Sequence, residues 1–202
     1  MKIIGVSGAV CSGKSTWVNN IVASSDRVVK CQYNLSDLDK TLKIMSSIDS
    51  LRKNDLEYLM FQMESLIFNT ISNTFYQENS EEYKDKIILQ DRTPLDTIYY
   101  LTKYINKNKN EFYSYMVEKI TEMFKHFSKN LYKLDYLLLF KPIEKNESCM
   151  VSTRPKEFDF KYQTEEFNEI KKMSKSIYNR DTTVLEENIG YYDNLILNLL
   201  NQ

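Results

Sequence analysis

Short runs of apolar residues alternate along the chain with longer segments in which apolar positions recur every three or four residues. The runs at 2–7, 27–33, 86–90, 135–140 and 183–186 predict β-strands. The periodic segments predict helices over roughly 14–24, 36–49, 94–107, 111–129, 163–178 and 190–201, and a further helix has its apolar residues between positions 56 and 75. This alternation indicates an α/β fold with a parallel sheet that helices cover on both faces.

Two segments show neither the apolar run of a strand nor the three- to four-residue recurrence of a helix. The polar segment 77–85 predicts a surface loop. The longer segment 141–161 lies between a predicted strand and a predicted helix and contains Pro142 and Pro155. Because long loops of compact domains often act as lids, we expect a lid over about 141–161.

Three of the four glycines lie in the first predicted strand and the turn after it. Residues 8–15 read GAVCSGKS and match the phosphate-binding loop GxxxxGK[ST] in its required place between a strand and a helix. Gly8 and Gly13 allow a tight turn in which backbone N–H groups converge on phosphate oxygens. In such a loop Lys14 reaches the β- and γ-phosphates and the Ser15 hydroxyl lies on Mg²⁺. The segment therefore predicts a binding site for a nucleoside triphosphate.

Composition limits the alternatives. The chain has 202 residues, 42% of them hydrophobic, which is enough for one sizeable core, and we interpret 1–202 as a single domain. The formal net charge of −1, with no massed basic residues, argues against a nucleic-acid partner. Cys11, Cys31 and Cys149 have neither disulfide-framework nor zinc spacing, so a reducing cytoplasm fits best. No apolar segment is long enough to cross a membrane.

A second group of candidate residues follows the predicted strand 86–90. Ligands of open parallel sheets bind at the carboxyl ends of the strands, so Asp91 and Arg92 are expected to face the same crevice as Lys14. Asp91 could hold a water of the Mg²⁺ shell or accept a proton from an attacking hydroxyl. Arg92 could bind a substrate phosphate or neutralise the transferred phosphoryl group. The alternative is that Asp91 only caps the next helix and Arg92 is a surface residue. For Asp96 two roles are left as alternatives: a function in the site, or an interaction with the dipole at the start of its helix.

The expected lid contributes a third group. Segment 152–163 alternates basic and aromatic residues, and phosphoryl transfer needs positive charge closed over the phosphates while water is excluded. Arg154 is the first candidate for this role, followed by Lys156, Lys161 and Arg180. The alternative is a solvated loop with incidental charges, which we favour for the last three residues.

With these motifs the chain resembles the P-loop nucleoside and nucleotide kinase superfamily over almost its whole length. The string Asp91–Thr93 is similar to the acid-arginine motif of thymidylate and deoxynucleoside kinases. The order of elements after Asp135 resembles ribosylnicotinamide-kinase-like ATPases in particular. The resemblance implies a three-layer P-loop NTPase fold, with a five-stranded parallel sheet of order 2-3-1-4-5, helices on both faces and a lid. It also implies ATP and Mg²⁺ as cofactors and a small acceptor above the sheet.

The resemblance assigns roles by position. It implies that the loop binds ATP through Gly8, Ala9, Val10, Cys11, Ser12, Gly13, Lys14, Ser15 and Thr16. It also implies that Ser15 and Asp91 bind the metal. Four residues are implied to act in catalysis: Lys14, Asp91, Arg92 and Arg154. One feature departs from the superfamily, whose nucleoside kinases usually have an acidic base just after the second strand. Here residues 33–36 read YNLS and Asp37 comes only later. Asp91 and Asp37 are therefore both candidates for the general base.

The leading hypothesis is an ATP- and Mg²⁺-dependent kinase of a nucleoside, nucleotide or related small molecule. One alternative is a regulatory ATPase that acts on a protein partner. Another is a kinase whose acceptor is a modified base or a 5′-hydroxyl in DNA. We expect no membrane partner, and a homodimer stays open.

Overall fold

A computed structural model describes residues 1–31, 55–107, 111–130, 132–144, 159–178 and 181–202. Its elements are, in chain order, β1 (Lys2–Gly8), α1 (Lys14–Ser24), β2 (Val28–Lys30), α4 (Asp55–Glu78), β3 (Ile87–Asp91), α5 (Pro94–Lys107), α6 (Glu111–Asn130), β4 (Tyr136–Phe140), α7 (Phe160–Ile177), β5 (Thr183–Leu185) and α8 (Ile189–Leu200).

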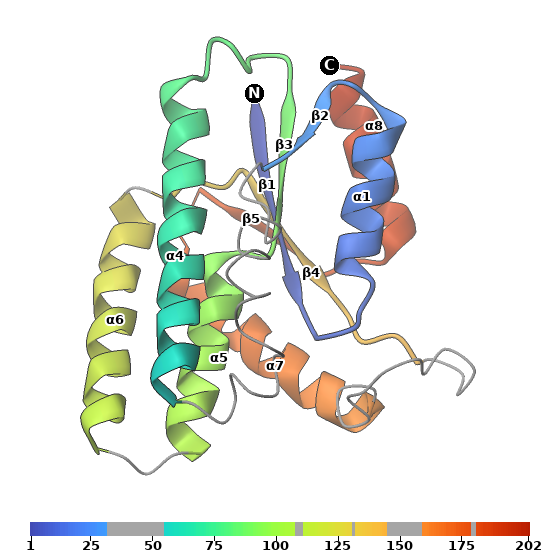
Figure 1. The fold of residues 1–202 in the computed structure, drawn as a ribbon. Coiled ribbons are helices and arrows are strands. Elements are labelled where there is room, and N and C mark those ends of the chain that lie inside the picture. The colour runs from blue at the N-terminus through green and yellow to red at the C-terminus, as the bar shows by residue number, and fades with distance from the viewer. Residues whose placement is uncertain (32–54, 108–110, 131, 145–158, 179–180) are drawn as a thin grey trace.

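The five strands of the described residues form one sheet of order β2-β3-β1-β4-β5 in which every neighbouring pair is parallel (Figure 1). In its register Val6 of β1 lies beside Asp91 of β3, and Gly8 lies beside Phe140 of β4. The loop that leaves β1 therefore begins between the carboxyl ends of β3 and β4. This edge of the sheet is where a ligand of an open parallel sheet binds.

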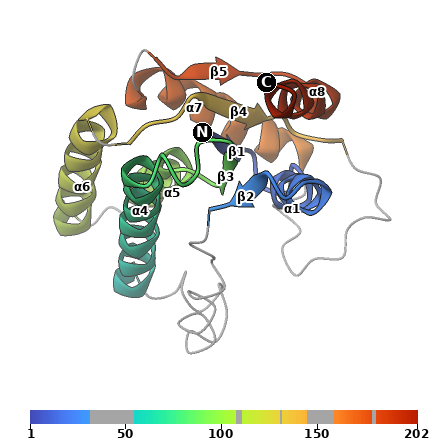
Figure 2. The ribbon, with the colours of Figure 1, turned by 90° about the horizontal axis from the view of Figure 1, so that it is seen from above.

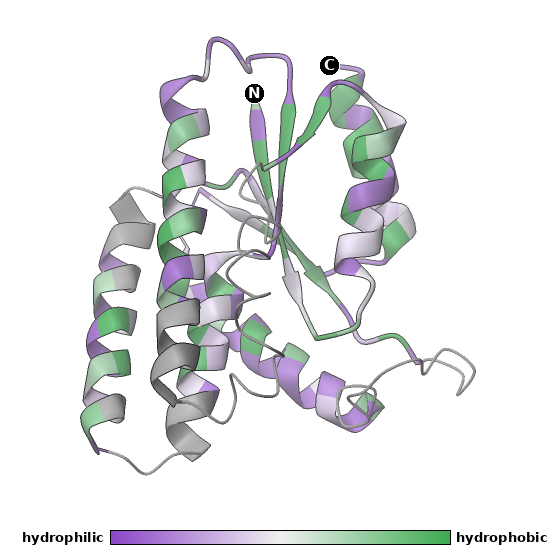
Figure 3. Cartoon of the chain, in the orientation of Figure 1, coloured by the Kyte–Doolittle hydropathy of each residue, from purple (hydrophilic) through white to green (hydrophobic). Residues whose placement is uncertain are grey.

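Helices cover both faces of the sheet (Figure 2). Side chains of a strand point alternately to the two faces. One set, which includes Ile88 and Leu139, packs with residues of α4, α5, α6 and α7, and the other, which includes Leu89 and Leu138, packs with residues of α1 and α8. Hydrophobic residues accordingly dominate the strands, whereas the helices carry both kinds of residue (Figure 3).

Local sequence signals explain where several helices begin. Asp159 caps α7, where its side chain accepts the backbone N–H of Lys161. Asn188 caps α8 in the same way, with the N–H of Tyr191 at 2.8 Å from its side-chain oxygen. Pro94 is the first residue of α5, where a missing N–H removes no helical hydrogen bond.

The expected fold is confirmed: five parallel strands in the order 2-3-1-4-5 lie between two layers of helices. α7 begins at Phe160, so the last residues of the expected lid belong to this helix. The predicted helix 36–49 lies outside the described residues. On α4, Leu66 is buried but Ile67 and Ile71 are half exposed, so the apolar face of this helix is only partly covered by the described residues. None of the described helices combines the length and hydrophobicity that a bilayer crossing requires.

Candidate active site at the carboxyl edge of the sheet

The loop between β1 and α1 depends on its glycines. Gly8 and Gly13 have φ angles of 132° and 85°, in the region that side chains disfavour. A Cβ atom on Gly8 would also lie 2.3 Å from the backbone oxygen of Phe140. Gly13 is the N-cap of α1 and offers no side-chain cap, so a helix N-terminus opens directly onto the loop. An uncapped N-terminus with converging N–H groups favours an anion.

Lys14 lies inside this loop, with only 5% of its surface exposed. Its ammonium donates to the carbonyl oxygens of Gly8 (2.8 Å) and Ala9 and to the Ser12 hydroxyl (3.3 Å). Burial, helped by the nearby Arg92 guanidinium, lowers the pKa of Lys14 to about 8. The loop thus holds a desolvated cation, which a polyphosphate would stabilise.

Asp91 and Ser15 meet beside the loop. The Ser15 hydroxyl donates to Oδ1 of Asp91 at 3.2 Å, and Oδ2 forms an ion pair with Lys30 at 3.4 Å. A hydroxyl and a carboxylate are the hard oxygen ligands that Mg²⁺ prefers, and Mg²⁺ commonly takes only one or two protein oxygens together with substrate phosphates. The described residues contain no group of three His, Cys, Asp or Glu that could hold a metal by themselves. The two residues therefore fit a Mg²⁺ ion that is held jointly with a nucleotide.

Arg92 follows directly in a strained conformation. Its φ is 73°, a left-handed value that is uncommon for a residue other than glycine, and its N–H donates to the carbonyl of Val6 at 3.0 Å. The guanidinium lies 5.9 Å from the ring centre of Tyr100. Desolvation opposes its charge, but Tyr100, Asp96 and Asp91 outweigh this and raise the pKa of Arg92. Backbone strain of this kind is typical of functional sites.

A buried chain of hydrogen bonds supports this turn. Thr93 is followed three residues later by Asp96, and the N–H of Thr93 donates to Oδ2 of Asp96 at 2.9 Å, as in a capping box. Ser7 donates to the same oxygen at 2.6 Å, so its 2.7 Å contact with Thr93 has the threonine as donor. Tyr178 in turn donates to Oγ1 of Thr93 at 2.5 Å. Asp96 thus fixes the start of α5 and the turn that carries Arg92.

Glu166 is the residue of this edge that the sequence interpretation missed. It is 1% exposed on α7, and its Oε2 accepts the N–H of Val10, the third residue of the phosphate loop, at 2.7 Å. Burial is the main cause that raises the pKa of Glu166. The sequence did contain a signal for it, because Glu166 lies on the same face of α7 as Phe167 and Ile170, and this face is buried. A carboxylate in such a row indicates a buried charge with a specific role.

Aromatic residues of α5 and α7 stand beside Glu166. Lys103 donates to the hydroxyls of Tyr99 (3.0 Å) and Tyr162 (2.6 Å). Burial is the main cause that raises the pKa of Tyr99 and of Tyr100, so both phenols stay neutral at physiological pH. They can therefore donate hydrogen bonds to a ligand.

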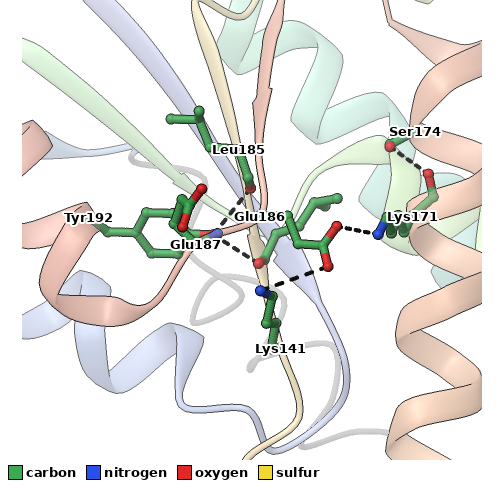
Figure 4. Close-up of polar contacts among 8 residues, drawn as sticks. Lys141, Lys171, Ser174, Leu185, Glu186, Glu187 and Tyr192 are labelled. Carbon is green, nitrogen blue, oxygen red and sulfur yellow. Dashed lines mark hydrogen bonds and ion pairs between the residues drawn. The ribbon is translucent and has the colours of Figure 1, made fainter.

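A second polar cluster lies where β4 and β5 end (Figure 4). Lys141 follows β4 and Glu186 follows β5, and Glu186 forms ion pairs with Lys141 at 3.8 Å and with Lys171 of α7. The Tyr192 hydroxyl of α8 accepts the N–H of Glu187 at 2.9 Å. The Lys171–Glu186 pair connects the end of β5 to α7, and the Tyr192 contact connects it to α8.

Of the predicted site residues, those of the loop, Asp91 and Arg92 lie at one edge of the sheet. Cys11 is partly buried with a φ of 57°, and Thr16 is exposed in the first turn of α1. Arg154 lies outside the described residues, as do Asp37, Lys156, Arg180 and most of the expected lid. Lys161 is exposed in the first turn of α7.

Comparisons with known proteins identify the fold. No family model matches the chain, and no curated protein matches it by sequence. Two structures of deoxyadenosine kinase from M. mycoides are similar to it. The complex with dCMP and dCDP has a TM-score of 0.59 and 13% identity over 98% of both chains, and the complex with dATP has 0.57 and 16% over 100% of both. Thymidylate kinase from Ehrlichia chaffeensis gives a TM-score of only 0.45 with 14% identity, over 100% of this chain and 98% of that one. The chain therefore has the fold of a P-loop nucleoside kinase.

Proposed function

We propose that this chain is a kinase that transfers the γ-phosphoryl group of ATP to a nucleoside, a nucleotide or a related small acceptor. The observation that carries the proposal is the buried Lys14 ammonium inside a glycine-dependent loop, at the same sheet edge as Asp91 and Arg92. The fold supports it, because it is shared with deoxyadenosine kinase at a TM-score of 0.59. Since fold alone does not determine function, the site residues carry the argument.

ATP would bind with its phosphates on the loop of residues 8–15. The uncapped N-terminus of α1 and the loop N–H groups would bind the phosphate oxygens. Lys14 would leave the loop carbonyls and donate to the β- and γ-phosphates, which would restore its ordinary basicity. Ser15 and Asp91 would hold Mg²⁺, which when bound offsets charge on the phosphates.

The acceptor would lie on the other side of the γ-phosphate, toward Arg92 and Tyr100. Arg92 keeps its charge and would neutralise the transferred group or bind an acceptor phosphate. Arg154 would add a second positive charge from the lid. Catalysis would come mostly from positioning and from electrostatic stabilisation, as is usual for phosphoryl transfer.

The test is transfer of label from γ-labelled ATP with Mg²⁺ to a panel of ribonucleosides, deoxynucleosides, their monophosphates and ribosylnicotinamide. We expect at least one labelled small molecule, and loss of its formation in Lys14→Met. Lys172→Met is the matched control, because Lys172 is an exposed lysine of α7. ATP hydrolysis with no labelled acceptor would contradict the proposal; stimulation of that hydrolysis by a protein would then favour a regulatory ATPase. Label only in DNA would identify a polymer kinase instead.

A further inference from the structure

Glu166 is a buried carboxylate at the phosphate loop, and one of its oxygens has no hydrogen-bond partner of ordinary length among the described residues. Oε2 is held by the Val10 N–H at 2.7 Å. The buried Oε1 accepts no hydrogen bond of ordinary length from the described part of the chain, although the Tyr100 hydroxyl faces the carboxylate. Buried carboxylate oxygens are normally hydrogen-bonded, so an unpaired one at a candidate site indicates a partner that binds there.

The other acids of this edge are engaged in contacts that hold the site together. Asp91 forms an ion pair with Lys30 through Oδ2 and accepts the Ser15 hydroxyl through Oδ1, so both of its oxygens are engaged. Oδ2 of Asp96 accepts from Ser7 and from the N–H of Thr93 at the start of α5, so this residue anchors the turn that carries Arg92, although its Oδ1 has no partner among the described residues. Both residues therefore already have roles at this edge.

Glu166 differs from them in its surroundings. Its largest electrostatic influence is burial, which disfavours the charge and raises its pKa, while Val10, Tyr100, Lys103 and Lys14 offset this only in part. These groups come from the loop, from α5 and from α1, and Tyr99 of α5 also faces the carboxylate. A carboxyl group whose basicity is raised by burial is the type that enzymes use to accept a proton near neutral pH.

Its place relative to the donor is also suitable. Glu166 contacts the third residue of the loop and lies within electrostatic range of Lys14, the residue that binds the β- and γ-phosphates in this motif. A permanently charged carboxylate beside a γ-phosphate would repel it. A carboxyl that shares a proton with an acceptor hydroxyl would not.

We propose that Glu166 is a catalytic residue that binds the acceptor hydroxyl through Oε1 and accepts its proton. This assignment rests on the proposed kinase function. In the transfer step the acceptor oxygen forms a bond to the γ-phosphorus, and the bond from that phosphorus to the β,γ-bridging oxygen breaks. ADP leaves with the electron pair of the broken bond, and the hydroxyl proton passes to Oε1 of Glu166.

The assignment narrows the substrate class. A hydroxyl acceptor has a proton to lose, whereas the phosphate of a nucleoside monophosphate is an anion that needs no base. The acceptor is therefore the hydroxyl of a nucleoside-like molecule, and nucleoside monophosphates are poor acceptors.

The test compares Glu166→Gln with wild type on the best hydroxyl acceptor of the panel. The glutamine oxygen can still accept the Val10 N–H, so the loop keeps its anchor while the base is lost. We expect kcat to fall by about 10²- to 10⁴-fold, the usual contribution of a general base, with the Kd of ATP within about twofold of wild type. The acid limb of the kcat–pH profile should disappear in Glu166→Gln. Glu165→Gln, at an exposed neighbour on α7, is the matched control and should behave as wild type.

Glu166→Asp is the second variant, because it keeps a carboxylate at a shifted position. It should keep the acid limb with a reduced kcat. A Glu166→Gln enzyme that keeps kcat and the acid limb would overturn the assignment, as would a parallel loss of ATP affinity, which marks a purely structural anchor. If the wild-type enzyme phosphorylated only monophosphates, the assignment of Glu166 would be overturned, whereas the kinase proposal would stand. A wild type that labels no acceptor would defeat the kinase proposal itself.

Discussion

Replacement of Asp96 tests whether the buried hydrogen-bond chain holds the turn that carries Arg92. In Asp96→Ala two charge-assisted hydrogen bonds are lost, from Ser7 at 2.6 Å and from the N–H of Thr93 at 2.9 Å. Each bond to a charged acceptor contributes about 1.5–3 kcal/mol. Ser7 still accepts from Thr93 at 2.7 Å, but the Ser7 O–H and the buried N–H of Thr93 both lose their acceptor. We therefore expect the free energy of unfolding to fall by about 3–6 kcal/mol.

Asp96→Asn is the matched control. Its side-chain oxygen can replace Oδ2 as the acceptor, and its NH₂ group replaces Oδ1, which has no hydrogen-bond partner among the described residues. The charge is lost and the buried NH₂ group lacks an acceptor among the described residues, so we expect a cost of about 2 kcal/mol, below that of Asp96→Ala. Guanidinium unfolding followed by far-UV circular dichroism and by the fluorescence of Trp17, the single tryptophan, gives both values. A cost below about 1 kcal/mol for Asp96→Ala, or equal costs for the two variants, would refute the reasoning.

Three further predictions concern the loop, the strained arginine and the buried acid. Gly8→Ala forces a Cβ onto the backbone of Phe140 and strains φ, so we expect a loss of at least about 2 kcal/mol and no ATP-dependent rise in Tm; a normal rise would contradict it. At the left-handed φ of Arg92, alanine is sterically strained and glycine is not. The free energy of unfolding of Arg92→Gly should therefore exceed that of Arg92→Ala by about 0.5–1 kcal/mol. Equal values would show that the backbone at this position is not strained. Because burial raises the pKa of Glu166, the unfolded carboxyl ionises first as the pH rises above 4.5, and stability is lost until the folded carboxyl also ionises. Glu166→Gln should therefore gain stability relative to wild type above pH 4.5 but not below it, as urea titrations across pH would measure; a pH-independent difference would argue against the shift.

The sequence predicts the fold because strand and helix signals are local. Apolar runs locate all five strands of the described sheet to within a few residues, and the glycine spacing locates the loop. Asp91 and Arg92 are predictable because strand ends of a parallel sheet share one edge. The motif explains Lys14 as a phosphate ligand, but its burial against Gly8 and Ala9 emerges only when the loop is closed.

Contacts between distant residues are what the sequence did not predict. Tyr178 reaches Thr93 across 85 positions, and Glu166 reaches Val10 across 156. Such pairings depend on how α7 packs on α5 and β1, which no local pattern specifies. Glu166 could have been suspected from its place in the buried row of α7, but its partner could not. Nor does helical periodicity distinguish the covered side of α4 from the half-exposed side that bears Ile71.

The central claim is phosphoryl transfer to a small hydroxyl acceptor. The most direct measurement is the ratio of phosphorylated acceptor to ADP formed in one reaction with ATP, Mg²⁺ and the best nucleoside of the panel, quantified together by mass spectrometry. The account predicts a ratio of about one for wild type, as the stoichiometry of phosphoryl transfer requires, and loss of both products in Lys14→Met. ADP formed without phosphorylated acceptor would contradict it, and would make the chain a nucleotide hydrolase.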